Sequence, residues 1–469
     1  MKAKGLCAAL TVLLCLTAAV SIGSTNRTIV SAASVSWPEG PSVDSPSVVV
    51  MEAETGTILY EKDSQVSHYP ASITKIMTTL LAIEYCDLDE VVTFSSDAVY
   101  NNEGDTSHIA RDVGEEMTME DCLYAVMLAS ANECAYAVAE HVGEKLGGDY
   151  QTFIDLMNEK AEELGCVNTH FNNCNGLPDD EHWTCAYDMA LIAQAAYDND
   201  IFRTITGTSK YTIGTTNKHS EETYLLNHHN MLYPYSSSDY LYDYCTGGKT
   251  GYTTEANYTL VTFAEKDGMA LICVVMNTEW TSQYEDTTTL FNYYFSNFSV
   301  VNIAENEEEL VGSGTVSAGL WNTNQSYAVL DEDAYILLPA GADISDVTYE
   351  ASEEDLSRKG IASLTFSYDG HVVGSVELQA SGAAVDSLFF GENALASTES
   401  NERVITIRPV HLAVAAGILV LLVALVFLCR AIARNIYVMR HNRVARRMEK
   451  QRFAKVKKKK YRKKDRLFH

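Results

Sequence analysis

The hydrophobic and polar positions of the chain change their period several times, and each change predicts a different element. Ser47–Met51 and Thr57–Tyr60 are β-prone runs separated by the turn residues Glu54-Thr55-Gly56, which predicts a strand, a turn and a returning strand. After Pro70 the apolar residues recur with a helical period, so we expect a helix to begin at about Ala71.

Helical patterns fill the region that follows, and apolar strand-like runs return near its end. Because strands at both ends enclose the helices, we predict one α+β domain over residues 40–298, an antiparallel sheet packed with helices. Its predicted helices are two between Met117 and Val142 that join at residues 130–132, then Phe153–Leu164, Tyr187–Tyr197 and Thr287–Phe295, and its predicted closing strands are Thr259–Phe263 and Ile272–Met276.

The pattern changes again after Val301, where short β-prone runs replace the helical periods. Asp369-Gly370 separates two of these runs and is a strong hairpin signal. We therefore predict a small all-β domain over residues 302–395, followed by a polar linker at 396–409. The predicted strands are Tyr327–Leu330, Ala334–Leu338, Ile361–Tyr368 and His371–Leu378.

Two apolar segments lie near the ends of the chain. Residues 1–33 are expected to be a secretory signal peptide that ends at Ser31-Ala32-Ala33, with an uncleaved N-terminal anchor as the alternative. Leu412–Cys429 has 18 residues and no charge, so residues 410–429 are expected to form a transmembrane helix. A buried core helix fits this segment less well because the run is apolar all round.

The charges of the chain are divided sharply at this segment. Residues 430–469 hold 17 Lys+Arg against two acidic residues, a net charge of +15, whereas the rest of the 469-residue chain holds 17 Lys+Arg against 61 Asp+Glu, a net charge of −44. The positive-inside rule places such a tail in the cytoplasm and the acidic body outside. We therefore expect a single-pass protein of the cell membrane with an extracytoplasmic body.

The run Lys457–Lys460 raises the question of nucleic-acid binding. A basic stretch just inside a membrane is attracted to anionic lipid by about 1 kcal/mol per residue, which explains the tail more simply. The expected partner of the tail is therefore the membrane, and no nucleic acid.

Eight of the eleven cysteines lie outside the signal peptide and the membrane segment, in a compartment that permits disulfides. Cys166, Cys174 and Cys185 are the best candidates for a bridge, whereas Cys273 lies in an apolar strand pattern and is expected to be a small buried hydrophobic residue. No Cys/His spacing resembles a metal site, so neither a metal nor another cofactor is expected.

Three short motifs carry the candidate chemistry, in the order Ser72-Ile73-Thr74-Lys75, Ser130-Ala131-Asn132 and Lys249-Thr250-Gly251. Together they supply a nucleophilic hydroxyl, an amine one helical turn away, a second hydroxyl with an amide, and a cation on a predicted strand. These are the parts needed for acyl transfer to a serine.

The spacing of Ser72 and Lys75 places both side chains on one face of a helix. Lys75 activates the Ser72 hydroxyl only when its amine is neutral, and both burial and the nearby cation of Lys249 are expected to lower its pKa. Ser130 suits proton transfer to a leaving amine.

The remaining motif residues suit substrate binding. Asn132 can hold a peptide amide, and Lys249 with Thr250 suits a carboxylate. Gly251 allows the substrate backbone to lie close beside the strand.

Longer stretches around these motifs resemble the D-alanyl-D-alanine carboxypeptidases of the low-molecular-mass penicillin-binding proteins, over roughly residues 45–298. This resemblance implies a penicillin-binding/serine β-lactamase-like catalytic domain. It also implies hydrolysis of the terminal D-Ala of peptidoglycan pentapeptides, and acylation by β-lactam antibiotics. The matching stretches are Pro70–Thr78, Ser130–Ala135, Asn168–Phe171 and Gly248–Thr253.

The resemblance also implies a role for each motif residue. Ser72 would be the acylated nucleophile and Lys75 its base, while Ser130 and Lys249 would provide the proton relay and the carboxylate site. The backbone N–H groups of Ser72 and Tyr252 would form the oxyanion hole.

Two positions depart from the family pattern. Gln283 stands where the family usually carries an arginine that helps to bind the terminal carboxylate of the substrate, and Asn257 stands where a glycine is usual. Gln283 therefore leaves the substrate preference open.

Three alternatives follow from the same motifs. A class A β-lactamase would need a Glu-x-x-Leu-Asn stretch, which Glu159–Leu164 does not contain. A D,D-endopeptidase or transpeptidase would use the same site, and a catalytically silent wall-binding membrane protein would not use it at all. The mechanism requires no histidine, so His170, His228 and His229 are expected to be structural or to line the cleft.

Overall fold

A computed structural model describes residues 35–101, 106–303, 306, 328–329, 334–352 and 360–380 of the chain. The predicted signal peptide, the linker 396–409, the predicted membrane helix 410–429 and the basic tail lie outside these residues. Within the described part, no helix is both long and apolar enough to cross a bilayer.

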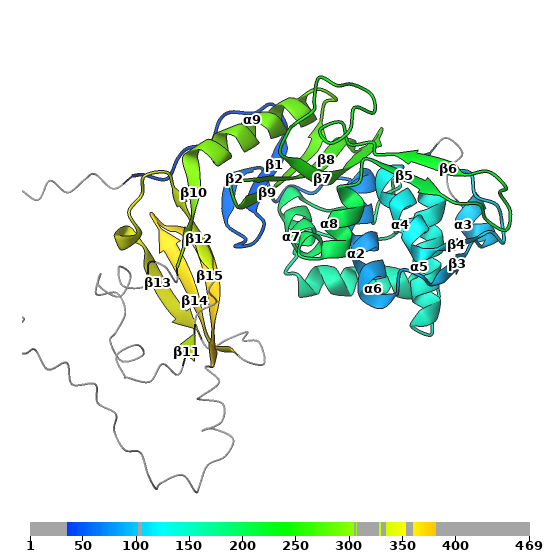
Figure 1. Ribbon diagram of the computed structural model, residues 1–469, viewed down its shortest axis with the longest axis horizontal. Helices are drawn as coiled ribbons and strands as arrows, with labels where there is room; N and C mark the ends of the chain where they lie inside the picture. The colour runs from blue at the N-terminus through cyan, green and yellow to red at the C-terminus, as the bar shows by residue number, and fades with distance from the viewer. Residues whose placement is uncertain are drawn as a thin grey trace, which may run out of the picture. The chain divides into compact units, whose positions relative to one another are not determined.

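The predicted α+β domain is built on a five-stranded sheet in the order β2-β1-β9-β8-β7, with every neighbouring pair antiparallel (Figure 1). The expected pairing of the two closing strands is confirmed, since Val261 lies opposite Val274. The strands are β1 (Ser47–Glu52), β2 (Ile58–Lys62), β7 (Cys245–Thr253), β8 (Asn257–Lys266) and β9 (Met269–Thr278).

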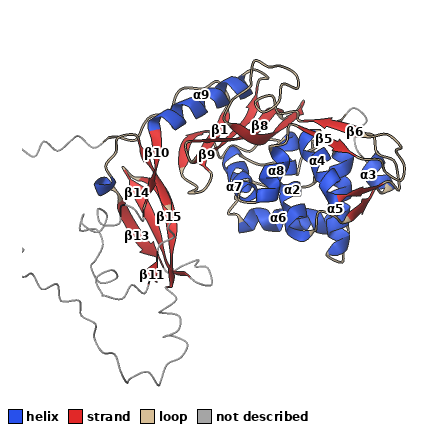
Figure 2. Cartoon of the chain, in the orientation of Figure 1, coloured by secondary structure: helices blue, strands red, loops and turns tan. Residues whose placement is uncertain are grey.

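Both faces of this sheet are buried, because successive side chains of a strand point to opposite faces. In β1, Val49 belongs to one apolar core, whereas Val48 and Val50 belong to the other. Figure 2 shows helices gathered on one face and α9 (Ser282–Asn297) along the other. The gathered helices are η1 (Ala71–Thr74), α2 (Lys75–Tyr85), α4 (Met119–Leu128), α5 (Asn132–Lys145), α6 (Tyr150–Glu163), α7 (Ala186–Tyr197) and α8 (Asp200–Thr206).

Each predicted helix is found within a few residues of its expected ends. The helix expected at Ala71 begins as the 3₁₀ turn η1 and becomes α-helical only at Lys75. The smaller elements are α3 (Ser96–Tyr100) and the strand pairs β3 (Val91–Thr93) with β4 (Glu116–Thr118) and β5 (Lys210–Ile213) with β6 (Thr223–Leu226).

The described residues after α9 form strands and short 3₁₀ turns such as η3 (Ile344–Asp346), with no α-helix among them. Asp369 and Gly370 have positive φ angles of 49° and 83° and join β14 to β15, as the hairpin signal predicts. The strands are β10 (Phe298–Asn302), β11 (Ala328–Val329), β12 (Tyr335–Pro339), β13 (Thr348–Ser352), β14 (Gly360–Tyr368) and β15 (His371–Ala380).

No bridge joins Cys166, Cys174 and Cys185, the best candidates for one, because all eight described cysteines are free thiols. These three are buried and each has a local partner instead. Cys166 Sγ donates to the carbonyl of Asp188, and Cys185 caps the N-terminus of α7. A domain with a large apolar core needs no covalent staple, so these thiols serve as small buried side chains, as Cys273 does.

Candidate active site

All three motifs meet at one cleft of about 560 Å³ in the α+β region. Lys75 and Lys249 do not line it. They are buried directly behind it, and each is hydrogen-bonded to one of its serines. The motif residues that line the cleft are Ser72, Ser130, Asn132, Thr250, Gly251 and Tyr252.

Ser72 lies in the 3₁₀ turn η1, immediately before α2 begins. Ala71 has a φ of +52°, a left-handed conformation that is unusual for a residue with a side chain. This turn places Ser72 Oγ in the cleft, 3.0 Å from Lys75 Nζ, as the spacing of the motif predicts. No side chain caps the start of η1, so backbone N–H groups remain there for an anionic group.

Lys75 is held by two oxygen atoms besides the Ser72 hydroxyl. Its Nζ donates to Asn132 Oδ1 at 2.7 Å and to the backbone carbonyl of Asn175 at 2.5 Å. No ion pair joins Lys75 to a carboxylate among the described residues. Burial lowers the pKa of Lys75 to about 7. The charges of Cys174 and Glu133 act in the opposite direction and raise it by less.

The three partners of Lys75 fit a neutral amine. A neutral amine has two N–H bonds and one lone pair. When the amine is neutral, the oxygens of Asn132 and Asn175 can accept its two N–H bonds, which leaves its lone pair for Ser72 Oγ. This is the arrangement of a general base within reach of the proton that it removes.

Ser130 and Lys249 form the second pair of the site. Ser130 joins α4 to α5 with a φ of +59°, and its Oγ lies 3.1 Å from Lys249 Nζ. Lys249 also donates to the carbonyl of Thr250 at 2.8 Å. Burial lowers the pKa of Lys249 well below its usual value, and the nearby Lys75 adds to this shift. For Lys75 itself only the expected effect of burial is confirmed, since Lys249 is not among the causes that shift its pKa.

Two glycines allow the backbone segments of the site to approach each other. A Cβ at Gly251 would lie 2.3 Å from Thr259 Oγ1 and 2.9 Å from the backbone nitrogen of Ser72. A Cβ at Gly176, whose φ is +85°, would lie 1.8 Å from the carbonyl oxygen of Ala71. Strand β7 and the loop around Gly176 therefore press against the Ser72 turn from two sides.

Gln283 also lines the cleft, which is where the family resemblance places the carboxylate-binding arginine that it replaces. Its side chain is 1% exposed, and its Nε2 donates to the carbonyl of Trp280 at 3.1 Å. Its Oε1 has no hydrogen-bond partner among the described residues. No arginine lines the described cleft, and its one carboxylate belongs to Glu255.

The histidines occupy the positions expected of them. His228 lines the cleft against Tyr235, and burial lowers its pKa to about 4. His229 is buried beside β7, and burial likewise lowers its pKa to about 4, while His170 stacks on Trp183. Neither His228 nor His229 is therefore protonated at neutral pH.

Asn175 is the site residue that the sequence did not reveal. It acts through its backbone carbonyl, which any residue possesses, so its identity gives no signal. The neighbouring Gly176, with its left-handed φ, is the only local hint of a tight loop there.

Comparisons with known proteins agree with this geometry. The family model described as Peptidase_S11, D-alanyl-D-alanine carboxypeptidase, matches residues 31–279. The D-alanyl-D-alanine carboxypeptidase DacF of Bacillus subtilis (strain 168) is 32% identical over 320 residues, which cover 66% of this chain and 77% of that protein. DacA of Escherichia coli (strain K12) is 27% identical over 381 residues, which cover 76% and 87%.

A solved structure matches the same region. The crystal structure of the Streptomyces K15 DD-transpeptidase has 30% sequence identity and a TM-score of 0.50. The match covers 55% of this chain and 100% of that chain. The sheet and helices around the cleft therefore have the penicillin-binding DD-peptidase fold.

Proposed function

The chain belongs to the D-alanyl-D-alanine carboxypeptidase family of serine peptidases, and from that premise we propose that Ser72 carries the acyl group during the reaction. The activity is that of a serine-type D-Ala-D-Ala carboxypeptidase. The observation that carries the assignment of Ser72 is the 3.0 Å contact between its hydroxyl and Lys75 Nζ, an amine whose pKa burial lowers to about 7.

Acylation begins when Lys75 removes the proton from Ser72 Oγ. The oxygen then attacks the carbonyl carbon of the penultimate D-Ala, and a negative charge develops on the carbonyl oxygen. The backbone N–H groups of Ser72 and Tyr252 stabilise this charge, because donors fixed in advance cost no reorganisation during the reaction. Gly251 brings β7 close enough to Ser72 for both groups to reach one oxygen.

The C–N bond to the terminal D-Ala then breaks. Ser130 Oγ passes its proton to the leaving nitrogen. It regains a proton from the two lysines, Lys75 and Lys249, of which Lys249 Nζ contacts Ser130 Oγ. Free D-Ala departs and leaves an ester on Ser72. Water attacks this ester, which releases the shortened peptide and restores the Ser72 hydroxyl.

Substrate recognition rests on the polar groups around the nucleophile. Asn132 binds the peptide amide, and Thr250 with Lys249 binds the terminal carboxylate of the peptidoglycan pentapeptide. A β-lactam presents a comparable amide and carboxylate, so penicillins acylate the same serine. Gln283 contributes no positive charge, and we expect it to weaken recognition of the carboxylate.

Labelled penicillin followed by peptide mass spectrometry tests this proposal. One peptide, the one containing Ser72, is expected to carry the label. Ser72→Ala should abolish labelling, whereas Ser236→Ala should not, since Ser236 lines the same cleft but has no role in the mechanism. Equal labelling of Ser72→Ala and wild type would refute the assignment.

Transfer of the acyl group to an amine acceptor is the second candidate activity. It is favoured by the match to a DD-transpeptidase. Incubation of a D-Ala-D-Ala peptide with and without a glycine acceptor separates the two activities. Hydrolysis gives only the shortened peptide, and transfer adds the acceptor to it.

The parts of the chain after the catalytic region support a membrane-bound arrangement. The strands after residue 298 suit a small all-β domain, and the charge-free run Leu412–Cys429 with its basic tail suits a transmembrane helix. Protease added to intact cells should digest the catalytic region and spare the tail. Protection of the catalytic region instead would reverse this topology.

A further inference from the structure

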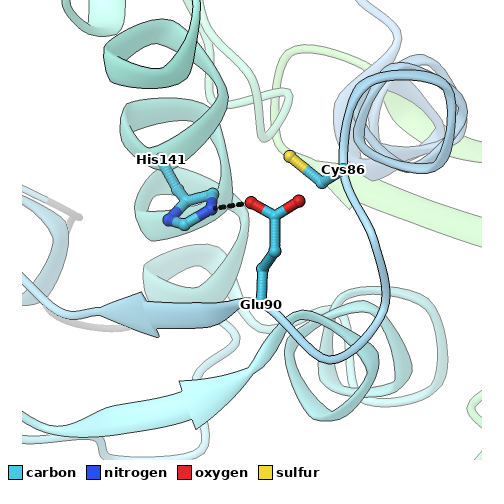
Figure 3. Close-up of side chains that lie close together, drawn as sticks. All are labelled: Cys86, Glu90 and His141. Carbon is cyan, nitrogen blue, oxygen red and sulfur yellow. Dashed lines mark hydrogen bonds and ion pairs between the residues drawn. The ribbon is translucent and has the colours of Figure 1, made fainter.

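Three metal-ligating side chains that are distant in the sequence meet outside the cleft. Cys86 follows the last residue of α2, Glu90 precedes β3, and His141 lies in α5. Figure 3 shows the three side chains pointing toward one another. One ligand atom from each lies within 4.8 Å of the others, and His141 Nε2 is 3.0 Å from Glu90 Oε2.

We propose that Cys86, Glu90 and His141 bind a borderline divalent transition-metal ion, with Zn²⁺ as the ion that fits best. One thiolate, one imidazole and one carboxylate form a donor set typical of zinc. Zinc–ligand bonds of roughly 2.0–2.3 Å require the donor atoms to lie about 3–4 Å apart. The observed separations reach this range with small side-chain rotations.

The burial of the cluster also fits a bound ion. Cys86 is half-buried, and the side chains of Glu90 and His141 are 23% and 22% exposed. The three donors are therefore fixed by packed helix ends, yet one side remains open. That side provides an entry path and a position for water as the fourth ligand of a tetrahedral site.

Lys145 would compete with the ion for the Glu90 carboxylate. Its Nζ lies 2.5 Å from Glu90 Oε1, one helical turn after His141. The histidine faces the other carboxylate oxygen, Oε2, so the ion and the ammonium group approach Glu90 at different atoms. Lys145 is 42% exposed and can turn into the solvent. On binding, the thiol proton is released to water and the imidazole ligates through its Nε2 lone pair.

The position of the cluster indicates what the ion would do. It joins the C-terminal half of α5 to the C-terminal end of α2, the two helices that carry Asn132 and Lys75 at their other ends. A metal there would lock these helices together without touching the cleft. The expected consequence is a higher Tm in the presence of the ion, with acylation of Ser72 unchanged.

Cobalt binding by the full-length protein tests the site directly. Co²⁺ substitutes for Zn²⁺ and gives a thiolate-to-cobalt charge-transfer band when a cysteine ligates it. Wild type should bind one Co²⁺ with this band, and Zn²⁺ should displace it. Cys86→Ser should lose the band, and His141→Ala should weaken binding at least about tenfold. Lys145→Met should tighten binding about two- to fivefold, because an exposed ion pair no longer competes.

Cys245→Ser is the matched control. Cys245 is likewise a free thiol that is partly buried, but it belongs to no metal-ligating group among the described residues. Its loss should leave the cobalt band intact. Labelling by penicillin reports whether each variant is folded, independently of metal binding. A band that persists in Cys86→Ser, or no band in folded wild type, would overturn the proposal.

Discussion

Helices α2 and α5 carry one polar cluster near their N-terminal ends and another near their C-terminal ends. Each cluster contains a lysine, and the pKa values of the two lysines are shifted in opposite directions. At the N-terminal ends, Lys75 is fully buried, contacts neutral oxygens, and has its pKa lowered to about 7. At the C-terminal ends, Lys145 is 42% exposed and pairs with Glu90, a hydrogen bond that raises its pKa. Burial and the charge of the partner, not the residue type, decide whether a lysine is a base or a cation.

The catalytic lysine has a cost in stability that the exposed one does not. The pKa of Lys75 is lower in the folded chain than in the unfolded chain, where it has the ordinary lysine value of 10.5. The unfolded state therefore binds more protons between about pH 7 and 10.5, so this group favours folding more as pH rises through that window. The contribution is at its least favourable below pH 7, where both states are protonated.

Replacement of Lys75 by methionine breaks the comparison most strongly. Lys75→Met removes the base, and acylation of Ser72 by penicillin should slow by about 10²- to 10⁴-fold. Stopped-flow labelling measures this rate. A loss of less than tenfold would mean that another group activates Ser72.

Asn132→Asp gives the N-terminal cluster a carboxylate beside its lysine, as the C-terminal cluster has in Glu90. It places a carboxylate beside Lys75 Nζ, where the amide oxygen now lies at 2.7 Å. The opposite charge should raise the pKa of Lys75 by roughly one to three units. The inflection of the acylation rate should therefore move to higher pH, with the rate near pH 7 reduced by about five- to five-hundredfold. Asn132→Ala, which adds no charge, is the control and should not raise the inflection.

Gln283→Arg adds to the cleft the cation that it lacks. A charged, bidentate donor to the terminal carboxylate contributes about 1.5–3 kcal/mol. Catalytic efficiency toward peptides ending in D-Ala-D-Ala should rise by about one to two orders of magnitude. The gain should shrink for peptides with an amidated C-terminus. Unchanged kinetics on the free-acid peptide would mean that Lys249 and Thr250 suffice.

Lys145→Met should have the smallest effect. The pair with Glu90 is exposed and screened by solvent, so the Tm should change by less than about 2 °C. The acylation rate should equal that of wild type. A marked drop in acylation would show that the C-terminal cluster acts on the cleft, against the present account.

The elements of the catalytic region were predictable where their apolar residues form a regular helical period or a short continuous buried run. Strand β9 and helix α7 lie where the apolar periods placed them, and Asp369-Gly370 marked its hairpin. Asn257 fits the same reasoning, since its φ of +54° is one that glycine and asparagine tolerate best. Strand β13 has a weaker pattern and was not predicted.

The site was predictable only where side chains carry the chemistry. Ser72, Lys75, Ser130 and Lys249 lie in contact in pairs, as their motifs indicated. The Asn175 carbonyl escaped notice because backbone groups leave no mark in a sequence. The grouping of Cys86 and Glu90 with His141 was not predicted, because His141 is 51 positions from Glu90 in the sequence. Only the packing of α5 brings these side chains together.

The pH dependence of Ser72 acylation tests the central claim most directly. If neutral Lys75 is the base, the acylation rate constant should rise about tenfold per pH unit below its pKa. It should level off above about pH 7, the pKa that burial gives this lysine. Stopped-flow labelling by a penicillin that does not titrate between pH 5 and 9 measures this profile. A rate that does not change through this range, or an inflection near 10.5, would contradict the account.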